Sequence, residues 1–376
     1  MSSRDVPRPH ADASDKKAAA GGDRKVVQWF DERLGLSDAI AFLRHKTVPL
    51  GGHTVWYYFG GVSLFLFGIQ VATGLLLLFY YKPGIDTAYE SVQFVVTRVP
   101  FGWLIRSLHS WSANLMVFAV FVHMFSVYFL KAYRPPRELT WFTGMALLGL
   151  TMTFGFSGYL LPWNTLAFFA TKVGTDIAGI LPVVGPGIAR LLRGGDDVGA
   201  ATLTRFFGFH VAMLPAAFTA VLLVHLLLIQ RQGMSESLGA KHEAPKGMPF
   251  YPGFILRDAI LWLGVFGVLL VLCTFMPWEL GPKADPFASA PAGIRPEWYF
   301  TFVSQSLKYL PAKILGIDGE VVGICTFLSG GAFLFLAPFL DRSAAHGRRS
   351  PVFTFVGVAI IAFMLTMVTL AYVKPY

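Results

Sequence analysis

The chain has 376 residues, of which 55% are hydrophobic and only 14% are charged, and its mean hydropathy is +0.57. This composition excludes an ordinary soluble globular domain and is typical of a polytopic membrane protein. The net charge of +9 is explained by membrane topology and lipid headgroups, so it gives no reason to expect a nucleic-acid partner.

Seven transmembrane helices are predicted from the apolar stretches, which makes the fold class all-α. Residues 1–23 are polar and are predicted to form a disordered arm, and residues 24–50 have the amphipathic pattern of a helix lying on the cytoplasmic surface. The first four spans are expected to form one four-helix domain over residues 51–232, followed by a cytoplasmic linker over 233–256 and a three-helix domain over 257–376. The predicted spans are 56–81, 106–130, 141–161, 206–230, 259–277, 321–340 and 352–373.

Charge predicts the orientation of these spans. If the N-terminus is cytoplasmic, that side of the membrane carries 19 of the 31 Lys and Arg residues. Orientation follows this excess, and an odd number of spans then places the C-terminus, Tyr376, outside. We therefore expect a multi-pass protein of a bacterial plasma membrane.

Four histidines lie inside two apolar stretches, where an ionisable side chain is costly and marks a functional site by default. His109 and His123 are fourteen residues apart, and His210 and His225 are fifteen apart. Either step is close to four helical turns, so the members of a pair point the same way, about 21–22 Å apart along the helix. Two such helices face to face would present two bis-histidine sites, which suits two haems that carry electrons.

Other residues repeat this spacing or mark the level of the outer interface. Taken alone, each histidine would more simply be a packing residue, and zinc fits poorly because its structural sites use short spacings with thiolates. Glycines at the fourteen-residue step would give backbone clearance to a macrocycle, although small residues also serve helix packing. Two arginines would either bind haem propionates or simply reach the interface. These candidates for haem contact are Gly60, Gly74, Gly144, Gly158, Arg106 and Arg205.

Cysteine usage limits what the chain itself can bind. Only Cys273 and Cys325 are present, and no C-x-x-C pattern occurs. Iron–sulfur clusters and covalently attached c-type haem are therefore excluded from this chain, and partner subunits would have to carry them.

Four segments of the chain contain distinctive motifs: FGWLIRSLHSWSANLMVFAVFVHMF, RPPRELTWFTGMALLGLTMTFGFSGYLLPW, ATLTRFFGFH and PEWYF. Together they resemble cytochrome b of the quinol-oxidising bc and bf complexes, and the resemblance covers about residues 24–376. It implies two noncovalent b-type haems in the first four helices. His109 and His210 would ligate the outer, low-potential haem, and His123 and His225 the inner, high-potential haem.

The same resemblance implies two quinone sites. The outer quinol site would contain Pro296, Glu297, Trp298 and Tyr299, with Tyr159 and the short helices after residue 162 as its other wall. Glu297 and Tyr299 would be the catalytic pair, with Glu297 as the proton acceptor, because a carboxylate in a partly apolar pocket has a raised pKa. Asp258 and Arg257 resemble the pair at the inner quinone site, although a solvated charge pair at a helix start is the competing interpretation.

The resemblance also implies a quinol:cytochrome c oxidoreductase, in which one electron passes to a Rieske-type iron–sulfur protein and the other crosses both haems to an inner quinone. Proton translocation, a c-type cytochrome partner and a homodimeric complex with bound lipids would follow. The sequence of the N-terminal half is bf-like, yet the four-span half and the three-span half are fused into one chain. Tyr58 stands where the bf pattern has a cysteine that tethers a third haem, so no covalent third haem is expected.

Two departures concern the inner haem, because Ser126 and Gln230 stand where related proteins carry arginine. Lys131, Arg134 and Arg231 are the candidate substitutes for neutralising its propionates. Two other classes of function remain open. A di-haem anchor of a dehydrogenase or hydrogenase would not need P-E-W-Y, and a non-redox transporter would show no b-type absorption band.

Overall fold

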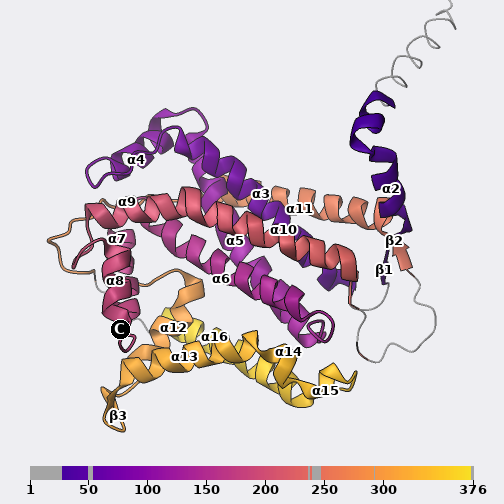
Figure 1. Ribbon diagram of the computed structural model, residues 1–376. Coiled ribbons are helices and arrows are strands. Elements are labelled where there is room, and N and C mark those ends of the chain that lie inside the picture. Colours follow the sequence, from indigo (N-terminus) through magenta and orange to yellow (C-terminus); the bar gives the residue numbers. More distant parts are fainter. Residues whose placement is uncertain (1–27, 50–53, 236–237, 239–246, 292, 374–376) are drawn as a thin grey trace, which may run out of the picture.

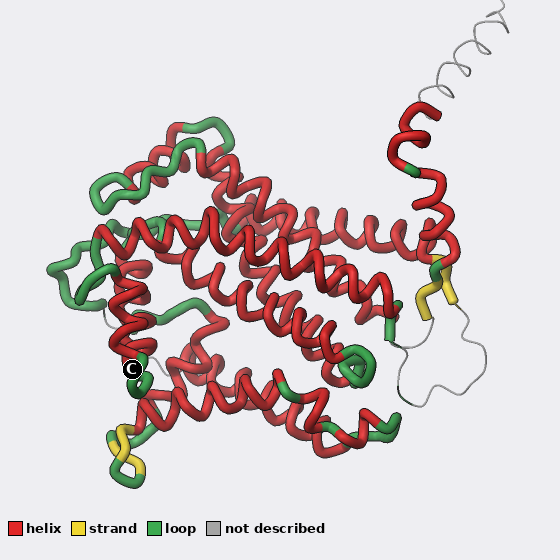
Figure 2. The backbone as a smooth tube through the Cα atoms, in the orientation of Figure 1, coloured by secondary structure: helices red, strands yellow, loops and turns green. Residues whose placement is uncertain are grey.

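The structure is a computed structural model that describes residues 28–49, 54–235, 238, 247–291 and 293–373. Within these residues it is helical apart from loops and two short two-stranded ribbons, which confirms the predicted all-α class (Figures 1 and 2). The predicted arm over residues 1–23 and most of the linker over 233–246 lie outside the described residues.

The long helices follow the predicted spans in order. The elements up to the linker are α2 Leu36–His45, β1 Thr47–Pro49, η1 Thr54–Tyr57, α3 Tyr58–Leu78, α4 Ala88–Arg98, α5 Gly102–Phe129, α6 Glu138–Leu160, α7 Thr165–Gly179, α8 Gly185–Arg193, α9 Ala200–Gly208, η2 Phe209–Met213 and α10 Leu214–Gln232. Those after it are β2 Gly247–Pro249, η3 Phe250–Phe254, α11 Ile255–Phe275, α12 Trp298–Lys308, β3 Lys313–Ile314, β4 Ile317–Asp318, α13 Gly319–Phe335, α14 Ala337–Leu340, α15 Arg342–Ala345 and α16 Pro351–Val373.

Six helical stretches within the described residues are long and apolar enough to cross a membrane. The predicted sixth span is present as α13, which has only 17 residues and continues into the short α14. At about 1.5 Å per residue, α13 alone is about 26 Å long, slightly less than the hydrocarbon thickness of about 30 Å. The seven predicted spans therefore correspond to six long helices and one shorter helix.

The long helices form two groups. Helices α3, α5, α6 and α10 run side by side, and α11 lies against α3 and α5, as Figure 1 shows. Their shared core contains Leu66, Leu108, Met116, Phe218 and Leu269. Helices α12, α13 and α16 form a second group along the other side of the bundle. Although α11 follows the linker in sequence, it therefore packs as a fifth helix of the histidine-bearing group.

The unequal histidine steps have a structural reason. Between α9 and α10 the helix widens into the π-helical turn η2, which contains His210. A π-bulge adds one residue to an α-helix without adding a turn. The fifteen-residue step from His210 to His225 therefore covers the same four turns as the fourteen-residue step on α5.

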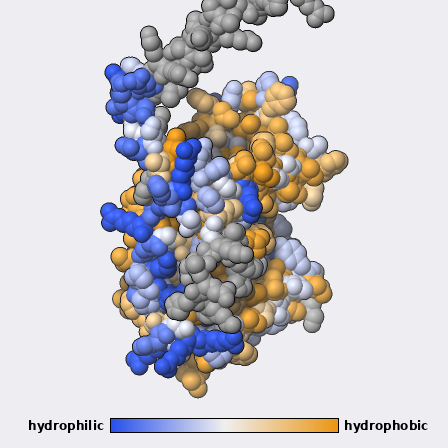
Figure 3. Space-filling view, turned by 90° about the vertical axis from the view of Figure 1, so that its right-hand side faces the viewer, coloured by the Kyte–Doolittle hydropathy of each residue, from blue (hydrophilic) through white to orange (hydrophobic). Residues whose placement is uncertain are grey.

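The surface has the polarity expected of a membrane protein. Large apolar side chains are exposed along the outside of the bundle, for example Leu75 on α3, Leu263 on α11 and Phe355 on α16. Figure 3 looks at the end that carries α2, β1 and α15, where hydrophilic residues gather between apolar flanks. At this end β1 pairs antiparallel with β2 and joins the start of α3 to the start of α11.

Candidate functional site

The first pair of histidines lies at one end of the bundle. The imidazole rings of His109 on α5 and His210 in η2 lie opposite each other, with their centroids 6.4 Å apart and their planes at 74°. Two imidazoles on opposite sides of one metal ion, with metal–nitrogen bonds of about 2.0 Å, would have centroids roughly 6 Å apart. A Cβ on Gly74 would lie 3.3 Å from Cε1 of His109, and a Cβ on Gly158 would lie 2.6 Å from Cε1 of His210.

The second pair lies four turns further along the same helices. His123 on α5 and His225 on α10 interact electrostatically with each other. A Cβ on Gly60 would lie 3.2 Å from Cε1 of His123, and a Cβ on Gly144 would lie 3.3 Å from Cε1 of His225. The four predicted glycines thus face the four predicted histidines one to one, and each provides room for the imidazole ring itself.

Hydroxyl groups hold three of the four imidazoles. Thr143 Oγ1 lies 2.8 Å from His225 Nδ1, and its own proton is used by backbone carbonyls of α6, at 3.0 Å from Leu139 O. The hydroxyl oxygen is therefore the acceptor, and Nδ1–H of the histidine donates. This assigns the proton to Nδ1 and leaves the Nε2 lone pair for a metal. The same arrangement joins Thr73 Oγ1 to His109 Nδ1 and Ser157 Oγ to His210 Nδ1, each at 2.9 Å.

Each of these hydroxyl residues directly precedes one of the four glycines. The sequence therefore contains three hydroxyl–glycine pairs at the histidine levels, a signal that the spacing argument missed. The fourth level differs because Phe59 precedes Gly60. In agreement, Nδ1 of His123 is buried without a hydrogen-bond partner among the described residues. One ligand of the inner pair therefore lacks the support that the other three have.

The two outer arginines are held by backbone carbonyls. Arg106 is 6% exposed and donates to the carbonyl oxygens of Trp278 and Glu279, the latter at 3.2 Å. Arg205 donates to the carbonyl of Leu191. Neither guanidinium forms an ion pair with a carboxylate in the described part of the chain, so both keep their positive charge for an anionic group nearby.

At the inner end the structure adds a cation that the sequence did not suggest. Lys46, next to β1, donates to the backbone and side-chain oxygens of Gln230, at 2.6 Å from the backbone oxygen. Ser126 Oγ instead bonds to the carbonyl of His123 at 2.7 Å. Lys46 therefore occupies the neighbourhood of Gln230, where the family pattern has arginine, whereas the predicted substitutes were Lys131, Arg134 and Arg231.

The P-E-W-Y residues pack against the outer end of α6. A Cβ on Gly155 would lie 2.7 Å from the Tyr299 hydroxyl, so Tyr299 occupies the space that this glycine leaves. Glu297 precedes α12 and acts electrostatically on both Tyr159 and Tyr299. Burial raises the pKa of the Glu297 carboxyl to about 7. Three of the predicted site residues, Glu297, Tyr299 and Tyr159, are thus brought together.

The remaining members of the motif fix its place. Trp298 Nε1 donates to Asn114 Oδ1 on α5 at 2.9 Å, a contact that the sequence did not predict. The backbone oxygens of Pro296 and Glu297 accept from the Thr301 hydroxyl at 3.0 and 3.1 Å, which holds the start of α12. The Tyr159 hydroxyl is buried and has no hydrogen-bond partner within the described residues, so it is available to a ligand.

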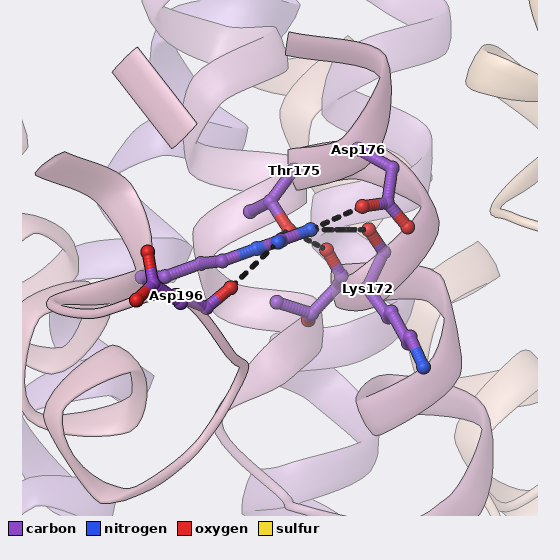
Figure 4. A network of polar contacts seen from close by, with 6 residues as sticks. Lys172, Thr175, Asp176 and Asp196 are labelled. Atoms are coloured by element: carbon purple, nitrogen blue, oxygen red, sulfur yellow. Dashed lines mark hydrogen bonds and ion pairs between the residues drawn. The ribbon is translucent and has the colours of Figure 1, made fainter. Parts of the chain in front are cut away.

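The short helices predicted after residue 162 are α7 and α8. Arg193 at the end of α8 ties them together through hydrogen bonds to Lys172, Thr175, Asp176 and Asp196, which are labelled in Figure 4. It donates to Thr175 Oγ1 at 2.8 Å, to Asp176 Oδ1 at 2.5 Å and to the carbonyl oxygen of Asp196 at 2.9 Å. This network joins α7, α8 and the loop after α8 to one another.

At the inner end, α3 and α11 meet in three successive contacts. The ring of Tyr58 stacks on Phe254 with centroids 4.7 Å apart. A Cβ on Gly61 would overlap the Asp258 carboxylate. The ring of Phe65 stacks on that of Trp262 at 5.4 Å.

These contacts leave polar atoms without partners. Tyr58 Oη, Asp258 Oδ1 and Trp262 Nε1 are buried, and no hydrogen bond of normal geometry satisfies them among the described residues, although Trp262 Nε1 lies close to the Asp258 carboxyl. Unsatisfied buried polar groups in one place call for an explanation, and a polar ligand is one. Arg257 is different: its side chain is exposed and forms no ion pair with Asp258 in the described chain.

Comparison with known proteins identifies the family. The family described as Cytochrome b/b6/petB matches residues 46–233, and the family described as Cytochrome b(C-terminal)/b6/petD matches residues 283–375. The chain belongs to the cytochrome b family. It is 47% identical over 367 residues to a "Cytochrome bc complex cytochrome b subunit" of Chlorobaculum thiosulfatiphilum, which covers 96% of this chain and 82% of that protein.

Two further similarities describe its type. "Cytochrome b6" of Synechococcus elongatus is 45% identical over 214 residues, which are 57% of this chain but 99% of that protein. A chain of a "Hyperthermophilic respiratory Complex III" superposes with a TM-score of 0.82 at 30% identity and covers 93% of this chain and 92% of that chain. The predicted fusion of a bf-like first half with a C-terminal half is confirmed, as are b-type haem binding and an integral membrane location for this family.

Loss of a histidine should remove one haem and leave the other. We expect His109→Ala or His210→Ala to abolish the outer haem, and His123→Ala or His225→Ala the inner one, because a six-coordinate site does not survive loss of an axial ligand. The reduced-minus-oxidised spectrum of the purified complex shows which haem is missing. Extraction of the haem with acid–acetone then gives the amount bound, and all of it should be extracted. Native spectra of both haems in any of these variants would refute the ligand assignment.

The hydroxyl–imidazole bond should be measurable separately. Thr143→Val removes the acceptor for Nδ1–H of His225 while keeping the shape of the side chain, and we expect about 10- to 100-fold weaker retention of the inner haem. Competition with apomyoglobin gives the rate and extent of haem loss. Thr153→Val on the same helix is the control, since Thr153 bonds only to the Gly149 carbonyl. Equal haem loss in both variants would contradict a role for the hydroxyl.

Proposed function

We propose that this chain is the haem-bearing cytochrome b subunit of a quinol:cytochrome c oxidoreductase in a bacterial plasma membrane, with its N-terminus in the cytoplasm and its C-terminus outside. The observation that carries the proposal is the pairing of four histidines with four glycines, together with Glu297, Tyr299 and Tyr159 beside the outer pair. Its partners in a homodimeric complex would be a Rieske-type iron–sulfur protein and a c-type cytochrome. The two cysteines of this chain lie on different helices, Cys273 buried in α11 and Cys325 exposed on α13, and form no C-x-x-C pattern for either cofactor.

Two noncovalent b-type haems are proposed, one for each histidine pair. When bound, they would supply a one-electron path from the outer to the inner end of the bundle. Nε2 of His109 and His210 would hold the outer haem, and Nε2 of His123 and His225 the inner one. The positive charges of Arg106 and Arg205 would neutralise propionates of the outer haem.

A covalent third haem is not proposed. Tyr58 replaces the cysteine that would attach it, and a tyrosine cannot form the thioether. Cys273 lies buried in α11 near its outer end, and Cys325 lies exposed on α13, so neither thiol is near the inner pair.

At the outer site, Glu297 would accept a proton from the quinol hydroxyl. Its carboxyl, with a pKa of about 7, is half ionised at neutral pH, so it can take up a proton and release it again. Burial, with the nearby Glu297 charge, raises the pKa of the Tyr299 hydroxyl, which therefore stays protonated and acts as a donor. The unpartnered Tyr159 hydroxyl would bond to the quinol oxygen from the α6 side.

At the inner site, quinone would bind beside the contact between α3 and α11, against the polar atoms that this contact leaves without partners. Asp258 would supply a proton to the reduced quinone, and the Tyr58 hydroxyl and Trp262 Nε1 would donate hydrogen bonds to its oxygens. Uptake of protons here and release at the outer face would make the reaction translocate protons. Arg257 would act only from the surface, because its side chain is exposed.

Replacing the proposed base should slow quinol oxidation without removing haem. In Glu297→Gln the side chain keeps its size but cannot accept a proton, and we expect turnover to fall by about 10²–10⁴-fold. In the unmodified complex the rate should rise about tenfold between pH 6 and pH 8, because the ionised form of a group with a pKa of about 7 increases over this range. This rise should be lost in the variant.

The measurement is quinol:cytochrome c reductase activity of the intact complex against pH. Glu320→Gln, an exposed carboxylate at the start of α13, is the matched control and should behave as the unmodified protein. An unchanged rate and pH profile in Glu297→Gln would show that another group accepts the proton.

Quinone binding at the inner site should weaken when a single hydroxyl group is removed. Tyr58→Phe removes only the unpartnered hydroxyl, and we expect the apparent affinity for quinone at the inner site to fall by about 3- to 10-fold, the effect of one hydrogen bond. Re-oxidation of the inner haem by added quinone, followed by stopped-flow absorbance, reports this. Tyr80→Phe, beyond the opposite end of α3, is the control. If the rate of inner-haem re-oxidation in Tyr58→Phe depended on quinone concentration as it does in the unmodified complex, the role of Tyr58 would be contradicted.

A further inference from the structure

A second site is indicated at the inner end, between the end of α5 and the start of α16. The side chain of Lys131, just after α5, is 2% exposed, and its Nζ has no hydrogen-bond partner among the described residues. The ammonium lies 4.7 Å from the centre of the Tyr128 ring. A buried lysine usually has an anionic or carbonyl partner, because its three N–H groups otherwise lose their hydration without replacement.

The carboxylate whose charge acts on Lys131, that of Asp341, does not fill this role. Asp341 accepts the Tyr133 hydroxyl at 2.6 Å and the backbone N–H of Ala344 at 3.1 Å, and it forms no ion pair with Lys131 within the described chain. Burial lowers the pKa of Lys131, and the more distant Asp341 charge opposes this. The Asp341 oxygens are therefore already engaged, and the lysine N–H groups remain unsatisfied.

Lys131 lines a cavity of about 520 Å³ next to the start of α16. The other polar side chains in its wall are Arg349, Ser350 and Thr354, and Phe129 and Phe355 form an apolar part. The first backbone N–H groups of a helix have no partner within it and favour a negative charge. Two cationic side chains and the start of α16 thus line one open pocket, whose volume is in the range of ligand sites.

The cavity continues into an apolar surface. Phe355, one turn into α16, is 74% exposed, and Val352 and Val358 on the same helix are also exposed. A ligand with a charged group in the cavity would therefore extend along apolar side chains parallel to α16. Free phosphate would use only the first part of this site, whereas a phospholipid would use both.

We propose that this cavity binds the headgroup phosphate of an anionic phospholipid, held by Lys131 and Arg349, with its acyl chains along α16. The bound lipid would link the end of α5 to the C-terminal helix group, which here touch through Tyr128: its hydroxyl donates to the Phe353 carbonyl at 2.7 Å. Lipid binding here does not depend on the function proposed for the haem and quinone sites.

The test compares lipid binding by variants of the intact, purified complex. Lys131→Met keeps the apolar length of the side chain, and Arg349→Gln removes the second charge. Arg348→Gln is the matched control, because it makes the same charge change one residue away from the cavity wall. Each complex is delipidated, exchanged into nanodiscs of phosphatidylcholine containing a small fraction of phosphatidylglycerol, and analysed for retained phosphatidylglycerol by native mass spectrometry.

We expect one tightly held phosphatidylglycerol per chain in the unmodified protein and in Arg348→Gln, and an at least tenfold lower affinity in both cavity variants. If Lys131→Met does not assemble, Arg349→Gln carries the test. Equal retention in all variants would overturn the proposal. So would displacement of the lipid by millimolar inorganic phosphate alone, which would assign the site to a free anion, or loss of the inner haem from Lys131→Met without loss of lipid.

Discussion

The arrangement of this cytochrome b depends on the close approach of a glycine in one helix to a histidine in the next. Imidazole rings from α5 and from η2 and α10 can enter the bundle interior only where α3 and α6 have no Cβ. The residue before the glycine then reaches the ring, and in three of four cases it is a hydroxyl that accepts from Nδ1. One short contact thus sets the position, the orientation and the tautomer of the imidazole.

The same kind of glycine contact positions a different site at each end of the bundle. At the outer end, the glycine facing His210 lies one turn from the glycine that accommodates Tyr299, so α6 brings P-E-W-Y next to the outer pair. At the inner end, α3 uses neighbouring glycines to contact His123 and Asp258, which places α11 beside the inner pair. The proposed quinone sites are therefore positioned by the same helices that position the histidines.

Much of the site was predictable because helical periodicity is a local property. The spacing of histidines and glycines follows from the number of residues per helical turn, and the structure places each glycine at the level of a histidine. The glycines were expected to give clearance to a macrocycle, whereas each lies against an imidazole ring. Arg257 was less predictable, because adjacent residues on a helix point about 100° apart, and only Asp258 faces α3. Lys46 near Gln230 was not predictable either, since 184 residues separate them and the β1–β2 ribbon joins their segments.

By itself, the sequence determined the spans, the histidine levels, the glycines opposite them and the family, because each rests on local composition or spacing. The tertiary structure decided which helix lies beside which. It assigned α11 to the histidine-bearing group, left Tyr58 and Trp262 with unpartnered polar atoms at the α3–α11 contact, and enclosed Lys131 beneath α16. Each of these features depends on which segments, far apart in the sequence, pack together and whether they supply hydrogen-bond partners for buried polar atoms. That is decided by packing and not by any single stretch of chain.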